Sequence, residues 1–355
     1  MTRFLIIGFA MAVLGAGCRS VGPDTISRDR FDYTSAISDS AKNQVLLNMV
    51  KLRYGDMPVF VDVSSVISQY SLENGISYGF GWMYSSGSPT EHTPSVGGST
   101  KYAERPTITY TPLTGDKFSR SILTPIPPSV LLFLVQSGRS VDAVFYLCVQ
   151  SVNGINNRYD GPMRSIPISP DFVEVLTRMR RIQQSGMLGM RVQTVVNNQT
   201  SVFYFREEMS PEIAEDSAWV RQKLGLNPQT HEFNVVYGAI PQNKNEIAIL
   251  SRSMMEILVQ LASSIDIPAD DLRQNRAYEV AKTEDPLAEL MSIRVRSGRE
   301  KPEDAFVSIL YRDKWFWIED TDFKSKQIFS GLMTLLSLME SDRGANQPVI
   351  TVPTG

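Results

Sequence analysis

The apolar residues of this chain change repeatedly from the spacing of a strand to that of a helix, and this order of elements constrains the fold more than any other feature. The patterns predict, in order, strand 142–152, helix 170–185, strands 188–196 and 200–206, helix 211–224, strand 231–238, helix 250–265, strands 289–296, 304–311 and 314–319, helix 322–340 and strand 349–352. Both halves begin in the order β-α-β-β-α. The sequence therefore predicts an α+β fold with two tandem βαββα-type modules, residues 126–228 and 229–355.

Local signals mark several ends of these elements. Ser169-Pro170 supplies an N-cap and a first helical residue, and Gly186 ends the same helix. A turn at Asn197-Asn198-Gln199 joins two strands as a hairpin, and Arg312-Asp313 joins another two. Residues 266–286 are charged and irregular, so an insertion is expected there.

The first 17 residues have the layout of a secretory signal peptide. A short positive start ends at Arg3, an apolar run covers 4–14, and small residues precede Cys18. The run is too short to span a membrane. Small residues ending in a cysteine resemble the cleavage site of bacterial lipoproteins, which implies cleavage before Cys18 and attachment of lipids to its sulfur and new amino group. Several acyl chains would anchor the chain durably, because each buried CH₂ contributes ~0.8 kcal/mol.

Residue 19 is Arg rather than Asp. By the same resemblance, this residue favours sorting to the outer membrane, with the body in the periplasm. Residues 18–37 are polar and predict a lipidated tether. After residue 17 no apolar segment is long enough for a membrane-spanning helix.

A helix and a β-rich region are expected over residues 38–125. The helix begins at Ser38 or Asp39, runs to about Tyr54 and ends at Gly55. Strands 75–85 and 101–112 are expected to pair as a hairpin. Gly, Ser, Thr and Pro dominate residues 85–100, which predict a flexible tip.

This hairpin has the alternation of a membrane strand pair, and each strand has about the ~10 residues needed to cross an outer membrane. Its candidate membrane or partner residues are apolar: Ile76, Tyr78, Phe80, Trp82, Tyr84, Ile108 and Tyr110. One hairpin cannot close its own edges, but a ring of copies could form a barrel. Glu104 and Pro106 break the barrel pattern, and they favour a hairpin packed on the body or on a partner.

Composition excludes several classes of protein. The 355 residues carry a net charge of −3, so no strong basic field exists and nucleic acid is not an expected partner. Two His and two Cys exclude most His/Cys metal sites, and no metal or cofactor is expected. The chain has no G-x-S-x-G, H-E-x-x-H or phosphate-loop motif. Cys148 lies in an apolar stretch that predicts a buried structural thiol.

Four residues near the C-terminus carry the main enzymatic alternative: Trp315, Trp317, Glu319 and Asp320. Two carboxylates beside aromatic rings could cleave a glycoside while the rings stack on sugar. The competing interpretation is structural: the two Trp side chains cover a core, and Asp320, Thr321 or Asp322 caps the following helix.

Other polar groups have weaker signals. The acidic group Asp266, Asp270 and Asp271 predicts a solvated loop, with an oxygen-ligand metal site as the alternative. The basic run Arg178, Arg180 and Arg181 predicts a solvent-facing helix face, or a contact with an acidic neighbouring subunit or lipid headgroups. Neither His92 nor His231 stands in a pattern typical of a catalytic triad.

Three stretches together resemble a family of uncharacterised lipoproteins of Gram-negative bacteria: SRSILTPIPPSVLLFLVQSG with CVQSVNGINNR, LYRDKWFWIEDTDFKSKQIFSGLMTLLSL, and the terminal PVITVPTG. The resemblance covers most of the chain after Cys18, and it implies no assigned activity. The order β-α-β-β-α is similar to that of ring-building modules in periplasmic secretion machinery. A lipid anchor combined with an amphipathic hairpin is similar to the architecture of curli-export-type pore lipoproteins.

We therefore expect a non-enzymatic, outer-membrane-anchored periplasmic lipoprotein with a structural or assembly role in an envelope complex, with a homo-oligomeric ring as one form. The membrane is contacted through the N-terminal lipid. The alternative is a peptidoglycan- or polysaccharide-binding protein or hydrolase that uses Trp315, Trp317, Glu319 and Asp320. No small-molecule substrate follows from the sequence.

Overall fold

A computed structural model describes residues 23–67, 70–80, 94–163, 165–195, 198–206, 209–280, 287 and 292–340. The chain divides into two compact units. Within the described residues, one unit takes in the chain up to Ser40 together with Val61–Pro112. The other takes in Ala41–Phe60 and the chain from Leu113 onward. Cys18 and the predicted strand 349–352 lie outside the described residues.

Helix α2 spans Pro23–Arg53, so it begins well before the predicted start at Ser38 or Asp39. The early part of this helix falls in the segment predicted to be a tether. Its polar sequence carries no apolar stripe, which is why periodicity did not reveal it. The apolar side chains Leu46, Met49 and Val50 in the later part are fully buried. Gly55, with φ of +75°, follows the helix as predicted.

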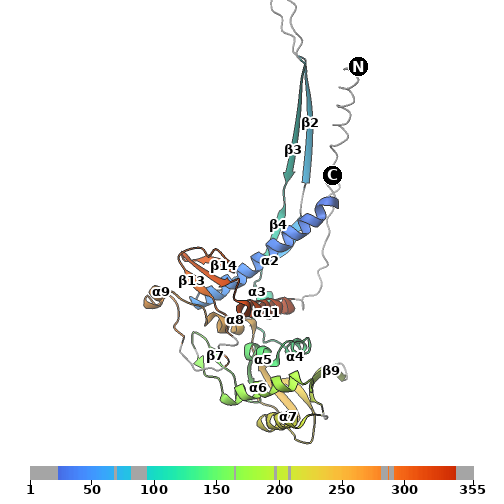
Figure 1. Cartoon of the computed structure of the whole chain (residues 1–355), viewed down its shortest axis with the longest axis vertical. Coiled ribbons are helices and arrows are strands. Elements are labelled where there is room, and N and C mark those ends of the chain that lie inside the picture. Colours follow the sequence, from blue (N-terminus) through green and yellow to red (C-terminus); the bar gives the residue numbers. More distant parts are fainter. Residues whose placement is uncertain are drawn as a thin grey trace, which may run out of the picture. The chain divides into compact units, whose positions relative to one another are not determined.

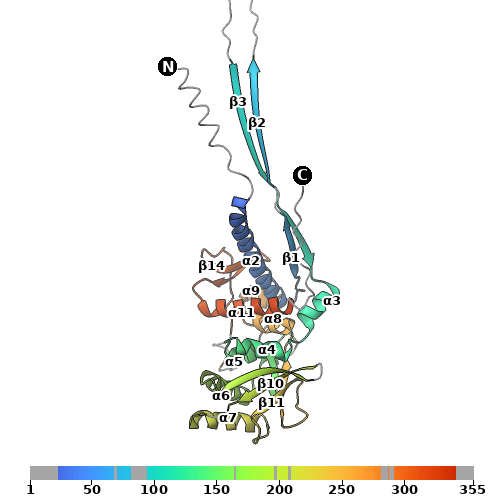
Figure 2. The same cartoon turned by 90° about the vertical axis from the view of Figure 1, so that its right-hand side faces the viewer.

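The first unit contains two separate pairs of antiparallel strands. Strand β1 (Val61–Ile67) pairs with β4 (Thr107–Pro112), and β2 (Tyr70–Phe80) pairs with β3 (Pro94–Glu104), as Figure 2 shows. The predicted second hairpin strand, 101–112, is therefore wrong as one element. It divides at Arg105-Pro106, because proline has no N–H to donate to a ladder. Residues 94–100, predicted to be a flexible tip, are part of β3.

The second unit is built on a six-stranded sheet with the order β6-β5-β12-β11-β10-β9. Its strands are β5 (Val149–Val152), β6 (Ile155–Asn156), β9 (Leu188–Val195), β10 (Asn198–Phe205), β11 (Glu232–Tyr237) and β12 (Glu246–Ser251). Helices and mixed sheets confirm the α+β class. The division into tandem modules is not confirmed. Strand β10 pairs with β11, and β5 pairs with β12, across the predicted boundary at residues 228 and 229.

Three helices pack on one face of this sheet: α5 (Val141–Cys148), α6 (Pro170–Gln184) and α7 (Pro211–Lys223) (Figure 1). Phe145, Met179 and Val220 from these helices meet sheet residues around a nearly filled interior space. The sheet contributes Val152, Phe203, Phe205, Val235, Ile247 and Ile249. The predicted strand 142–152 is wrong over most of its length, because residues 141–148 are helix α5 and only β5 is extended.

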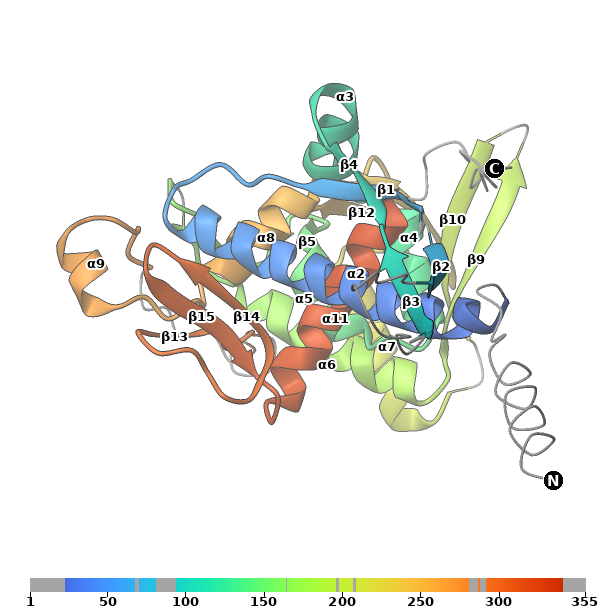
Figure 3. The same cartoon turned by 90° about the horizontal axis from the view of Figure 1, so that it is seen from above.

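A smaller three-stranded sheet has the order β13-β15-β14 and stands out in Figure 3. It consists of β13 (Arg296–Gly298), β14 (Ala305–Tyr311) and β15 (Lys314–Glu319). The predicted turn at Arg312-Asp313 joins β14 to β15, and both residues have positive φ, 48° and 60°. Of the predicted strand 289–296, residues 292–296 are described, and among them only Arg296 belongs to a strand, β13.

The remaining elements of the second unit are short connections and helices. They are α3 (Gly115–Phe118), the π-helix η1 (Ser119–Leu123), α4 (Pro128–Gln136), β7 (Tyr159–Asp160), β8 (Ser165–Ile166), α8 (Met254–Ala262), α9 (Ala269–Arg273) and α11 (Phe323–Glu340). Among the described helices, none is both long enough and apolar enough to cross a membrane.

Candidate functional site

The longest strand pair of the first unit, β2–β3, is the main candidate and is called the ribbon below. Ile76 pairs with Gly98, Tyr78 with Val96, and Phe80 with Pro94. Because strand residues alternate between faces, the register gives the ribbon two different faces. One face receives Tyr70, Leu72, Asn74, Ile76, Tyr78, Phe80, Pro94, Val96, Gly98, Thr100, Tyr102 and Glu104. The other receives mostly Ser and Gly, together with Glu73, Lys101 and Ala103.

The outer edges of the ribbon have no strand beside them in the described part of the chain. Strands β2 and β3 form a two-stranded sheet of eleven residues each. An edge strand presents a row of N–H and C=O groups that can pair with another strand. An isolated two-stranded ribbon is marginally stable in water. The register therefore assigns most apolar residues of the ribbon to one face, and both edges lack a neighbouring strand in the described residues.

The other predicted hairpin residues are placed elsewhere or are not described. Ile108 pairs with Val66 and Tyr110 pairs with Val63, so both belong to the β1–β4 pair and not to the ribbon. This corrects the prediction that they share a hairpin with Ile76. Ile108 and Tyr110 are 41% and 58% exposed. Trp82, Tyr84 and His92 lie outside the described residues.

The three-stranded sheet of the second unit carries the predicted glycan residues. Trp315 and Trp317 are half-buried on one face of β15, while Phe316 and Ile318 on the other face are fully buried. The Lys301 ammonium lies 5.6 Å from the Trp315 ring centroid. Lys301 therefore makes a cation–π contact with one face of the Trp315 ring.

The two carboxylates predicted for hydrolysis are engaged in ion pairs. Glu319 lies 3.1 Å from Arg296, and Asp320 lies 2.6 Å from Lys326. Asp322 accepts a hydrogen bond from the Ser325 backbone N–H at 3.0 Å, and therefore caps α11 as one of the structural alternatives predicted. Burial raises the pKa of Asp322, but the bonds from Ser325 outweigh this effect and lower it.

The acidic group in the 266–286 segment is not a solvated loop throughout. Asp271 is 2% exposed and accepts hydrogen bonds at 2.6 Å from the Tyr54 hydroxyl and from the Lys314 ammonium. Burial raises the pKa of Asp271, and these two bonds outweigh burial and lower it. Burial and the bond to Asp271 raise the pKa of Tyr54. Among the described residues, no His, Cys, Asp and Glu cluster has the composition of a metal site.

The basic run on α6 was predicted to face solvent, and Arg180 and Arg181 are exposed, but all three arginines also form ion pairs within the unit. Arg178 and Arg181 both reach Asp216 on α7, at 2.8 and 2.7 Å. Arg180 reaches the buried Asp142 on α5 at 2.7 Å. The bond from Arg181 lowers the pKa of Asp216 below its usual range. These arginines therefore join helices within the unit.

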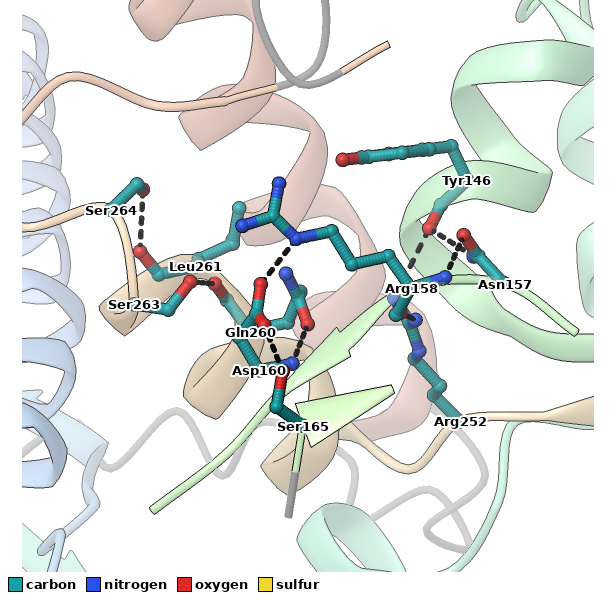
Figure 4. A network of polar contacts seen from close by, with 10 residues as sticks. All are labelled: Tyr146, Asn157, Arg158, Asp160, Ser165, Arg252, Gln260, Leu261, Ser263 and Ser264. Carbon is teal, nitrogen blue, oxygen red and sulfur yellow. Dashed lines mark hydrogen bonds and ion pairs between the residues drawn. The ribbon is translucent and has the colours of Figure 1, made fainter. Parts of the chain in front are cut away.

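A buried polar network, which the sequence did not predict, lies at the C-terminal end of α5 (Figure 4). The Arg252 guanidinium is 1% exposed and donates to the carbonyls of Tyr146 at 3.1 Å and Leu147 at 3.0 Å, and also to the Arg158 carbonyl. Asn157 donates to the same Tyr146 carbonyl at 2.8 Å. The last carbonyls of a helix have no partner within it, so these donors satisfy them. Burial lowers the pKa of Arg252.

The network continues to α8 through Asp160. Its backbone N–H donates to Gln260 at 2.8 Å, and its carboxylate accepts from Ser165 at 2.8 Å and from Arg158 (Figure 4). These bonds join the end of α5, strand β7 and helix α8. The bonds drawn in Figure 4 all run between the protein's own groups, although the buried Arg252 Nε has no partner among the described residues, so the network stabilises the fold.

The two remaining candidates, Cys148 and His231, lie in the packed part of the second unit. Cys148 is 1% exposed, and burial raises its pKa to about 12, which disfavours the thiolate. His231 is half-buried just before β11, and its carbonyl accepts the Phe205 backbone N–H at 2.9 Å.

Comparison of the chain with models of protein families, with curated proteins and with solved structures finds no match.

Proposed function

We propose that this chain is a non-enzymatic, outer-membrane-anchored periplasmic lipoprotein that assembles with copies of itself through the ribbon. The lipid on Cys18 holds the chain at the membrane. The ribbon supplies the contact between copies. Cell-envelope assemblies of this kind need an anchor and a repeated interface, and the chain supplies a candidate for each.

The observation that carries this proposal is the pairing of the ribbon. Eleven residues in each strand extend over roughly 35 Å at a rise of ~3.4 Å per residue. Both outer edges lack a neighbouring strand in the described residues. Side-by-side copies would pair these edges and bring the apolar faces together into one continuous surface.

A deletion tests this role while preserving the strand pair at the base of the ribbon. Ile67 pairs with Thr107 at the end of β1–β4. Replacing residues 68–106 by Asn-Gly would close that pair as a two-residue hairpin. We expect the intact lipoprotein, extracted in mild detergent, to give a discrete multimer in native mass spectrometry, and the deletion variant to give a single chain. A single-chain mass for the intact protein, or a multimer for the variant, contradicts the proposal.

Point variants distinguish the two faces of the ribbon. Tyr78→Lys places a charge on the apolar face, and Ser77→Lys places the same charge one residue away on the other face. We expect Tyr78→Lys to raise at least tenfold the subunit concentration at which the multimer dissociates. Ser77→Lys should leave that concentration unchanged. Equal effects of the two variants would show that the continuous apolar surface does not contribute to the assembly.

A second candidate function is glycan binding through Trp315 and Trp317. The shared, half-buried face of these two rings supports it. The ion pairs of Glu319 and Asp320 favour binding over hydrolysis. We expect Trp315→Ala with Trp317→Ala to abolish sedimentation with peptidoglycan, and Leu310→Ala to reduce it, because Leu310 pairs with Trp315 on the same face and is 54% exposed. Unchanged sedimentation of the double variant would exclude this site.

A further inference from the structure

The second unit contains a cleft of about 480 Å³ between the α4–α5 hairpin and helix α11. Its floor is apolar, with Leu134, Val144, Leu147, Ile328 and Leu335. Ligand clefts in proteins commonly have about 300–1,000 Å³ and a mainly apolar lining with a few polar groups. The volume and the lining of this cleft both fall in that class.

Three cationic side chains also line the cleft: Arg139, Arg180 and Lys324. Arg180 is already paired with Asp142 at 2.7 Å. In the described part of the chain, Arg139 and Lys324 form no ion pair, and both are exposed. They therefore place two exposed positive charges, which are not neutralised by an ion pair among the described residues, where they can bind an anionic ligand.

Ser140 adds a polar group to the same lining. Its hydroxyl oxygen is buried and has no hydrogen-bond partner among the described residues. A buried hydroxyl without a partner is costly, and a change of the Ser140 rotamer would let a ligand oxygen relieve this cost. Cys148 also lines the cleft, but its side chain is almost fully buried.

We propose that this cleft binds a single-chain anionic amphiphile, with its acyl chain on the apolar floor and its anionic head at Arg139 and Lys324. After a change of its rotamer, the Ser140 hydroxyl donates to a head-group oxygen. A small polar anion would leave the floor uncovered, and a neutral hydrocarbon would leave both cations unused. Carboxylate and phosphate heads share this chemistry, so a free fatty acid and a lysophospholipid are the two sources to distinguish. The site lies in the second unit and does not depend on the ribbon.

One substitution in the lining can fill part of the cleft. A Cβ built on Gly331 of α11 would meet only the Arg139 guanidinium, at 3.9 Å, which is ordinary contact. Gly331→Leu therefore places a side chain toward the cleft and also favours the helix. Gly331→Ala adds one methyl group and is the matched control.

The test measures binding of cis-parinaric acid, a fluorescent 18-carbon fatty acid, to residues 19–355 produced without lipid and free of detergent. We expect saturable binding to the native sequence, at least tenfold weaker binding to Gly331→Leu, and nearly unchanged binding to Gly331→Ala. Circular dichroism confirms that each variant is folded. Absence of saturable binding to the native sequence, or equal affinity of the folded Gly331→Leu variant, would overturn the proposal.

Charge variants test the mouth of the cleft. We expect the double variant Arg139→Gln with Lys324→Gln to bind cis-parinaric acid at least tenfold more weakly. Binding of the neutral methyl ester should weaken much less. Arg206→Gln with Lys244→Gln removes two exposed cations outside the cleft lining and should change neither affinity. Competition by oleic acid and by oleoyl lysophosphatidylglycerol identifies which head group binds more tightly. Equal losses for acid and ester would refute the role of the two cations.

Discussion

Asp271→Asn is the substitution whose effect the structure defines most closely. The side chain of Asp271 is 3% exposed and that of Lys314 is 19% exposed, with 2.6 Å between their charged atoms. Asparagine keeps an acceptor for the Tyr54 hydroxyl but removes the negative charge. Leaving one partner of a buried ion pair uncompensated costs about 3–5 kcal/mol. Because Lys314 can recover part of its hydration, we expect a loss of about 2–4 kcal/mol in the free energy of unfolding.

The neighbouring residue is the matched control for this experiment. Asp270 pairs with Arg273 on the surface, with the two side chains 51% and 71% exposed. A surface pair of this kind contributes about 0–1 kcal/mol, so Asp270→Asn should hardly change stability. Urea unfolding followed by tryptophan fluorescence measures both variants, because Trp315 lies beside Lys314 on β15. Equal midpoints for the two variants would refute the assignment of Asp271 as a buried centre of charge.

The structure also predicts three further effects on stability. The pKa values of Asp216, Asp271 and Asp322 are lowered in the folded chain, so their stabilisation is complete above the unfolded-state pKa of about 3.9 and is lost as the pH falls through the folded values. Urea midpoints measured from pH 6 downward should therefore fall in acid, and a constant midpoint would contradict this. Ser253→Ala removes the capping box of α8 and should cost about 1 kcal/mol in the same assay, whereas no loss would exclude the cap. Gly186→Ala, at φ of +74° in open space, should cost about 1 kcal/mol from backbone strain alone, and a neutral result would contradict that conformation.

Elements with strong local signals could be predicted from the sequence. Helix α6 begins after Ser169 and ends before Gly186, as the capping pattern indicates. Strands β14 and β15 and the turn between them are also as predicted. In these places short-range chemistry decides the backbone conformation: proline fixes φ at a helix start, and positive φ is tolerated at a tight turn.

Strand β12 and helix α5 could not be assigned from periodicity. Glu246–Ser251 is a central strand, and the run Ile247 to Leu250 is apolar without alternation. A strand buried on both faces has no period of two, so the predicted helix 250–265 wrongly begins at the end of this strand. Val141–Cys148 is rich in β-branched and aromatic residues, yet its buried face packs as a helix. Short apolar runs of this kind fit both structures, and only tertiary packing decides between them.

The same limit explains why the prediction of tandem modules is not confirmed and why the polar contacts cannot be predicted from the sequence. A repeat of element order does not specify which strands are neighbours, and here β5 lies beside β12 from the other half of the chain. Asp270 and Asp271 are adjacent and chemically identical, but only Asp271 meets Tyr54 and Lys314, which come from distant parts of the sequence. Long-range contacts therefore make one carboxylate a buried centre and leave the other on the surface. A site that combines side chains from several elements, such as the cleft between α5 and α11, also depends on long-range contacts and cannot be predicted from local sequence patterns.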